Sequence, residues 1–289
     1  MLTRILLLLV ASLALRADDR TMRLVARLSQ EAEAFQKIAP ELVGQETLFQ
    51  RALKPPSKLR RWVTKPEKAP ELVWQERRIV SEYGFSTLSH GEGPLHELRQ
   101  VISVDGRNVQ DSKKAADQLA KAITAHDDTR KKQMLEQFEK YGLIGAVTDF
   151  GQLILLFNPR DIERYEFTFR RHELQGAAHL LVFGYKQIDG PEALTVIDAQ
   201  HKDQIKRMRI EGEVWTREDT LAPVRITMVA SEGDGEAEPE VRQEATVDYA
   251  ISPEGWLLPS STEHRERRDG NVVVENKFSY SDFHRFTGK

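Results

Sequence analysis

Residues 241–283 of the chain, VRQEATVDYAISPEGWLLPSSTEHRERRDGNVVVENKFSYSDF, decide its fold. Apolar side chains alternate with polar ones in VDY (247–249) and again in FSY (278–280), and a period of two is typical of a sheet with one face in water. Two sequences that favour tight turns, SPEG (252–255) and DG (269–270), interrupt the alternation. The stretch therefore predicts three consecutive antiparallel strands.

The same alternation continues towards the N-terminus. It recurs in YEFTFR (165–170), in residues 207–214 and in residues 224–228. Everything after about residue 160 therefore predicts an antiparallel meander of roughly seven strands.

The first half of the chain mixes helices with strands. A helix with one apolar face is predicted before Pro40, and strand patterns follow at 42–52, 71–88 and 95–104. Three helical segments, the first capped by Asp111, are expected between residues 111 and 157. The fold class is therefore α+β: one large curved antiparallel sheet, open like a half-barrel, with an N-terminal helix and about three helical segments covering one face. A single domain over 18–289 would comprise a helix and N-terminal strands (18–110), a helical segment (111–157) and the meander (158–289).

Residues 1–17 have the order of parts of a cleavable secretory signal. Arg4 is followed by an apolar run over 5–15, then by Arg16 and the small Ala17. A membrane span needs about 20 apolar residues, so this run is too short to serve as an anchor. The alternative interpretation is a buried N-terminal helix. We expect a soluble protein that is exported to the periplasm or beyond it and has no transmembrane anchor.

Composition limits the partners. The chain has no cysteine, which excludes disulfides and a lipid-modified cysteine. Without residues 1–17, 40 basic residues stand against 45 acidic ones, a net charge of −5. Because binding to nucleic acids normally needs a net basic face, we do not expect a nucleic-acid partner.

The sequence contains no recognisable catalytic motif. Gly-x-Ser-x-Gly, Ser-x-x-Lys and the phosphate-binding loop are all absent. A zinc-hydrolase helix needs a second histidine four residues after the first, but Gln100 follows His96 at that spacing and Gly176 follows His172. We expect no catalysis, no metal and no cofactor.

Two further groups of polar residues are weaker candidates. His90, Glu92 and His96 could fold around a metal, although a hairpin turn with surface histidines is the favoured interpretation. Ser281, Asp282 and His284 are the three residue types of a catalytic triad. A regular strand, however, would place Ser281 on the opposite face from the other two.

Residues 209–226, RIEGEVWTREDTLAPVRI, resemble the strand, turn and strand G-x-(V/I)-W-(I)-D…T-x-x-P-x-R of outer-membrane lipoprotein-sorting-like proteins. Thr216 and Arg217 depart from that pattern, where an apolar residue and an aspartate are usual. The order of elements likewise resembles the half-barrel of periplasmic lipoprotein carriers. Residues 247–249, 256–259 and 278–283 are similar to poorly characterised exported bacterial proteins of this layout. The resemblance covers about residues 160–286.

The resemblance implies a carrier. One face of an open sheet needs a cover, helices can supply it, and a cover that lifts admits an acyl chain at about 0.8 kcal/mol per buried methylene. The favoured hypothesis is an exported envelope protein that binds an apolar ligand such as a lipid or lipoprotein acyl chain without catalysis. The predicted apolar lining consists of Phe167, Phe169, Met208, Ile210, Val214, Val224, Ile226, Met228, Val247, Tyr249, Phe278 and Tyr280.

Alternatively, the same side chains pack as a closed core, and the protein is an interaction or scaffold module of the cell envelope. The basic segment 54–68 could dock on an envelope protein or an anionic membrane surface, although a solvated hairpin loop is the plainer interpretation. The docking residues would be Lys58, Arg60, Arg61 and Trp62. An unrecognised hydrolase that uses the loop 90–96 is a third hypothesis.

Overall fold

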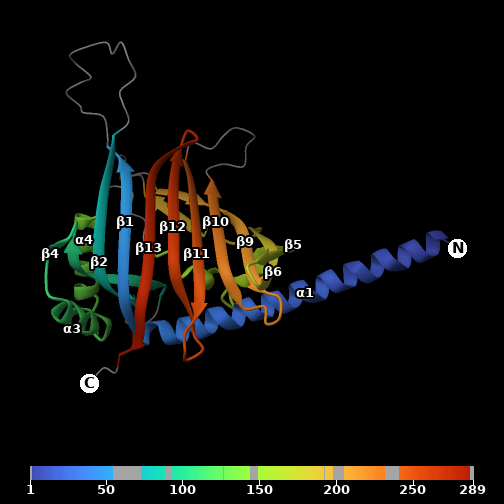
Figure 1. Cartoon of the computed structure of the whole chain (residues 1–289), viewed down its shortest axis with the longest axis horizontal. Coiled ribbons are helices and arrows are strands. Elements are labelled where there is room, and N and C mark those ends of the chain that lie inside the picture. Colours follow the sequence, from blue (N-terminus) through green and yellow to red (C-terminus); the bar gives the residue numbers. More distant parts are fainter. Residues whose placement is uncertain are drawn as a thin grey trace, which may run out of the picture. The chain divides into compact units, whose positions relative to one another are not determined.

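The computed structural model describes residues 2–54, 73–88, 93–125, 127–143, 149–191, 193–197, 205–231 and 241–286. Side chains are described from Asp19 onward, except over 195–207. Figure 1 shows the helices, α1 (Leu2–Ile38), α3 (Ser112–Ile123) and α4 (Thr129–Tyr141), and the short 3-10 helices are η1 (Ala39–Glu41), η2 (Leu153–Phe157) and η3 (Ile162–Arg164). The strands are β1 (Leu42–Leu53), β2 (Trp74–Thr87), β3 (Leu95–Val104), β4 (Arg107–Asn108), β5 (Tyr165–Gln175), β6 (Ala178–Gln187), β7 (Leu194–Ile197), β8 (Ile205–Met208), β9 (Ile210–Arg217), β10 (Pro223–Ser231), β11 (Val241–Ile251), β12 (Leu257–Arg268) and β13 (Asn271–Arg285).

Eleven of the described strands form one antiparallel sheet, in the order β4-β3-β2-β1-β13-β12-β11-β10-β9-β6-β5. The sheet is open, because β4 and β5 are its two edges. Seven of its strands come from the second half of the chain, and β7 and β8 pair separately. The predicted α+β class with one large open antiparallel sheet is confirmed.

The chain divides into two compact units. Unit 1 comprises residues 1–38, 150–233 and 244–260, and unit 2 comprises residues 39–149, 234–243 and 261–289. Among the described helices, none is both long and apolar enough to cross a membrane.

In unit 1, the apolar face of α1 is fully buried. Leu24, Leu28, Ala32 and Phe35 are each at most 1% exposed, as their spacing of three and four residues predicts. The helix packs on η2 and on β5. The glycine of the motif at residues 209–226 is required by the packing of two strands. A Cβ on Gly212 in β9 would lie 2.0 Å from the carbonyl oxygen of Thr227 in β10, so only glycine fits there.

In unit 2, β1 pairs with β13 on one side and with β2 on the other. The two predicted Asp-Gly turns are confirmed. Asp105 and Gly106 have φ of 51° and 76°, and Asp269 and Gly270 have φ of 47° and 75°, as a type I′ hairpin turn requires.

Helices α3 and α4 pack on β2 and β3, beside which Figure 1 draws them. The carboxylate of Asp111 accepts a hydrogen bond from the Lys114 N–H, which confirms the predicted cap of α3. The core between these elements includes Val43, Leu98 and Leu119.

Two local expectations were wrong. The predicted strand through Met208 and Ile210 is broken at Arg209, where β8 ends and β9 begins. Strand alternation also fails at Asp282, whose φ is 56°. Its carboxylate therefore accepts a hydrogen bond from the Ser281 hydroxyl at 3.0 Å rather than pointing to the opposite face.

Candidate functional site

Ten of the twelve predicted lining residues belong to unit 1, and Phe278 and Tyr280 belong to unit 2. Nine are buried, namely Met208, Ile210, Val214, Ile226, Met228, Val247, Tyr249, Phe278 and Tyr280. Phe167, Phe169 and Val224 are half-buried. We call the ten residues of unit 1 the apolar stripe.

The apolar stripe contains one irregularity. Ile226 pairs with Val214 in the ladder between β10 and β9, and Pro223 pairs with Thr216. The register shifts between Pro223 and Arg225, so that Val224 is the extra residue of a bulge. Its half-buried position follows from this bulge.

The 3-10 helix η2 contacts the apolar stripe of unit 1 at Phe167 and Tyr249, and helix α1 packs on it. Leu153, Ile154 and Phe157 are at most 5% exposed. The Phe157 ring meets three other rings edge-on, with centroid distances of 5.6 Å to Tyr165, 5.4 Å to Phe167 and 5.0 Å to Tyr185. The residues of η2 therefore form a cover that touches the stripe through apolar and aromatic contacts.

The Tyr249 hydroxyl of the stripe is hydrogen-bonded to this cover. It accepts a hydrogen bond from the Ile154 N–H at 2.9 Å and donates one to the Gly151 carbonyl oxygen at 3.2 Å. A short 3-10 helix has weaker hydrogen-bond geometry than an α-helix. Removing the hydroxyl therefore weakens the attachment of the cover and leaves the aromatic packing in place.

Unit 2 contains a buried ionic cluster that our sequence analysis did not predict. We call Glu46, Glu97 and Arg99 the Arg99 cluster; each is at most 3% exposed. Arg99 donates from Nε and Nη2 to the two carboxylate oxygens of Glu46 at 2.8 Å, and from Nη2 to Glu97 at 2.5 Å. The cluster is surrounded by rings, since the guanidinium lies 5.3 Å from the Tyr83 centroid and 5.7 Å from that of Phe278.

The Arg99 cluster holds one cation against two carboxylates. Burial raises the pKa of Glu97 from 4.5 to about 7, and although Arg99 opposes this rise, Asp149 and Glu46 add to it. Burial raises the pKa of Glu46 as well. A carboxyl that titrates near neutrality can act as an acid or a base, but Glu97 is 0% exposed. Protonation of Glu97 is therefore expected to change the free energy of unfolding of unit 2.

This raised pKa predicts a pH-dependent effect of Glu97→Gln. Because the folded pKa of Glu97 lies above its unfolded value, the stability contributed by the bound proton is complete below about pH 4.5 and is lost as pH rises through about 7. The loss is at most about 3 kcal/mol. Glutamine stays neutral, so Glu97→Gln should be more stable than the wild type at pH 8 and no more stable at pH 4.5.

Urea unfolding between pH 4.5 and 8 measures this difference. Glu213→Gln is the control, since Glu213 pairs with Arg171 on the surface and such pairs contribute about 1 kcal/mol or less. A Glu97→Gln protein that is less stable than the wild type at pH 8 contradicts the expectation.

A second polar network crosses unit 2 at His264, which is 0% exposed. Its Nε2 lies 2.6 Å from the Gln243 Oε1 and its Nδ1 lies 3.0 Å from the Asn276 Nδ2. Burial lowers the pKa of His264 to about 3, so the imidazole stays neutral in the fold. Gln243 also donates to Glu266 at 3.1 Å, which continues the network.

The other candidates from the sequence lie partly outside the described residues. The docking residues Lys58, Arg60, Arg61 and Trp62 lie outside the described residues, as do His90 and Glu92. His96 Nδ1 lies 3.4 Å from Asp149 Oδ2. The part of the chain that the structure describes has no group of three His, Asp or Glu placed to hold a metal.

The exposed Ser281, Asp282 and His284 do not form a relay. The Ser281 hydroxyl donates to the Asp282 carboxylate, and His284 Nδ1 lies 2.8 Å from the Asp282 backbone oxygen. No described contact joins the hydroxyl to the imidazole, so serine and histidine are not arranged as nucleophile and base.

No protein-family description matches this chain, and no curated protein matches its sequence. Three solved structures are similar in fold. A putative outer membrane lipoprotein-sorting protein domain from Vibrio parahaemolyticus is 11% identical, with a TM-score of 0.36 over 91% of this chain and 92% of that one. A DUF1329 family protein from Desulfovibrio piger is 10% identical, with a TM-score of 0.35 over 92% of each chain. A LolA superfamily protein from Nitrosomonas europaea is 10% identical, with a TM-score of 0.30 over 90% of this chain and 94% of that one.

Proposed function

We propose that the protein is an exported, non-catalytic binding protein of the cell envelope that shields an apolar group such as a lipid or lipoprotein acyl chain. The observation that supports this proposal is the apolar stripe of unit 1, which the short 3-10 helix η2 contacts at Phe167 and Tyr249. In the described state the cover occupies the stripe, so a ligand binds by displacing it.

The energetics of this exchange set a minimum length for the ligand. Uncovering the three buried side chains of η2 costs about 1.5–3 kcal/mol each, or about 5–9 kcal/mol in total. An acyl chain gains about 0.8 kcal/mol per methylene that it buries. About six to eleven methylenes are needed to offset the cover, so chains of 16 carbons should bind and chains of 8 carbons should bind far more weakly.

Two measurements test the proposal. Mass spectrometry of protein purified from its native envelope should detect a bound lipid, and titration with fluorescent fatty acids should show the dependence on chain length. If neither a co-purified lipid nor any affinity for a 16-carbon chain is found, the carrier hypothesis is wrong. The scaffold with a closed core is then the remaining alternative.

Tyr249→Phe should tighten the binding of a 16-carbon fatty acid at least about fivefold. The substitution removes the two hydrogen bonds that the hydroxyl makes to Gly151 and Ile154, each worth about 0.5–1.5 kcal/mol, and leaves the ring in place. Titration calorimetry measures the change. Tyr185→Phe is the matched control, because its hydroxyl donates to the Thr227 carbonyl oxygen of β10 and not to the cover. Equal effects of the two variants would contradict a covering role for η2.

A further inference from the structure

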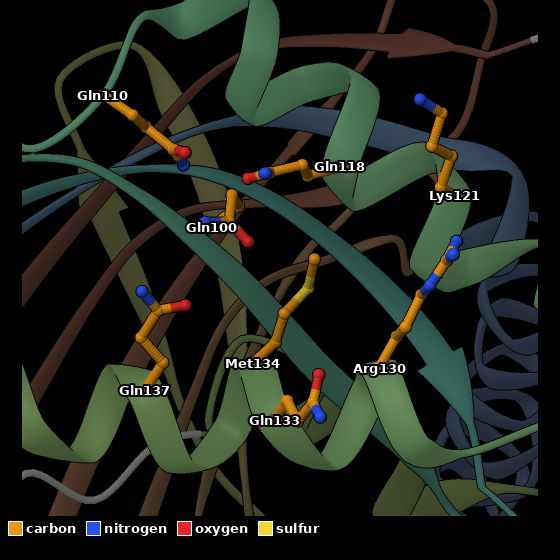
Figure 2. A pocket seen from close by; sticks show the side chains of 8 residues that line it. All are labelled: Gln100, Gln110, Gln118, Lys121, Arg130, Gln133, Met134 and Gln137. Atoms are coloured by element: carbon orange, nitrogen blue, oxygen red, sulfur yellow. The ribbon is translucent and has the colours of Figure 1, made fainter.

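Unit 2 contains a pocket whose chemistry differs from that of the apolar stripe. It has a volume of about 430 Å³, within the range of small-molecule sites. Figure 2 shows its lining, in which α3 and α4 face each other across β3. The lining residues are Gln100, Gln110, Gln118, Lys121, Arg130, Gln133, Met134 and Gln137. We call this site the glutamine pocket.

The glutamine pocket is built for a polar, negatively charged ligand. Five of its eight side chains are amides, and each amide offers two donor hydrogens and an acceptor oxygen. Two side chains are cations and none is an acid, so the charge of the lining is positive. In Figure 2, Arg130 reaches from α4 towards α3, on the same side of the pocket as Lys121. Both cationic residues are drawn on the right of the pocket in Figure 2 and Gln110 and Gln137 on the left, although the Lys121 nitrogen points away from Arg130.

Gln100, on β3, is the buried polar residue of the lining: it is 6% exposed as a whole, and its amide makes no hydrogen bond to any described residue. None of its amide atoms is among the described polar atoms that are shut off from solvent without a partner, so the amide remains open to the pocket. Lys121 and Arg130 are exposed, and they make no ion pair within the described ranges. The donors and acceptors of these three side chains are therefore available to a ligand.

We propose that the glutamine pocket binds an acidic sugar. The amides of Gln100, Gln118 and Gln137 would exchange hydrogen bonds with the sugar hydroxyls. Lys121 and Arg130 would take the carboxylate or phosphate, to which a guanidinium can donate two parallel hydrogen bonds. The lining has no aromatic ring on which a nucleobase could stack, and Met134 is its one apolar side chain, so bases and acyl chains do not fit it. This proposal is independent of the carrier role.

Calorimetric titration of the full chain with four probes tests the ligand class. Glucuronate and glucose 6-phosphate should bind, and glucose and inorganic phosphate should each bind at least about tenfold more weakly. Binding of glucose as tight as that of glucuronate overturns the role of the cations. Inorganic phosphate binding as tightly as glucose 6-phosphate overturns the role of the amides. Failure of both acidic sugars to bind at millimolar concentration overturns the proposal.

Variants locate the site. The double variant Lys121→Gln with Arg130→Gln should weaken glucuronate binding at least about tenfold. Lys113→Gln with Lys114→Gln is the control, because it removes the same charge from exposed positions of α3 outside the pocket. Equal losses in both double variants would mean that only net charge matters, and would overturn the site.

Gln100→Leu separates binding from folding. The substitution roughly keeps the shape of the side chain and removes an amide that bonds no described residue, so the thermal midpoint should stay the same or rise. Glucuronate affinity should nevertheless fall at least about tenfold. If the glucuronate affinity of this variant is unchanged, the role assigned to Gln100 is wrong. As a control, the variant should bind a 16-carbon fatty acid as tightly as the wild type does.

Discussion

Replacing Arg99 by leucine is expected to lower the free energy of unfolding by about 3–5 kcal/mol, the usual cost of removing one partner from a buried ion pair. Arg99 contacts both Glu46 and Glu97, each of which is at most 1% exposed. Removing it takes away the positive charge that pairs with both buried carboxylates. Urea unfolding at pH 8 measures the loss.

The pH dependence of this loss identifies its cause. Burial raises the pKa of both Glu46 and Glu97, so both carboxyls can be neutralised by protons in mild acid. The penalty of Arg99→Leu should therefore shrink between pH 8 and pH 5. The matched control is Arg171→Leu, since Arg171 bridges Glu213 and Glu173 on the surface, where the loss should be about 1 kcal/mol or less. A pH-independent loss for Arg99→Leu would point to lost packing against Tyr83 instead.

The alternation of apolar and polar residues and the turn sequences were sufficient to predict the sheet. Asp-Gly at 105–106 and at 269–270 tolerates the positive φ of a hairpin turn, which makes the signal specific. The irregularities were not predictable in the same way. The bulge at Val224 and the positive φ of Asp282 depend on neighbouring strands and leave no mark in the local sequence.

The twelve apolar residues that the sequence predicts as a lining belong to two units. Phe278 and Tyr280 alternate as Met208 and Ile210 do, but they pack in unit 2 beside the Arg99 cluster. The sequence did contain one indication of the Arg99 cluster. Glu46 alternates with the same period as Leu42 and Leu48, on the buried face of β1. A charge on an apolar face requires a buried partner, but sequence spacing does not say which strand supplies it.

The glutamine pocket could not have been predicted from the sequence. Its lining comes from β3, from the segment before α3, and from α3 and α4. Each segment alone contributes one to four residues, among them glutamines of the kind that cover any solvated helix face. Only the packing of α3 and α4 on β2 and β3 brings them around one space.

Phe157→Ala is expected to cost about 3–5 kcal/mol of unfolding free energy, as large aromatic truncations in cores do. The ring is 0% exposed and loses three edge-on contacts, to Tyr165, Phe167 and Tyr185. Chemical unfolding measures the effect. Phe49→Ala is the control, because Phe49 is 38% exposed and should cost far less. A loss below about 1 kcal/mol for Phe157→Ala would mean that η2 contributes little to the core of unit 1.

The same substitution distinguishes a cover from an ordinary part of the core. If η2 competes with an acyl chain for the apolar stripe, weakening its hold raises the population of the binding-competent state and hence the apparent affinity. Phe157→Ala should then bind a 16-carbon fatty acid at least about tenfold more tightly, which corresponds to about 1.4 kcal/mol. An ordinary core truncation has no such effect, because its cost falls on every folded state equally. A variant that is destabilised yet binds no more tightly than the wild type would show that η2 is a fixed part of the core and that the stripe is closed.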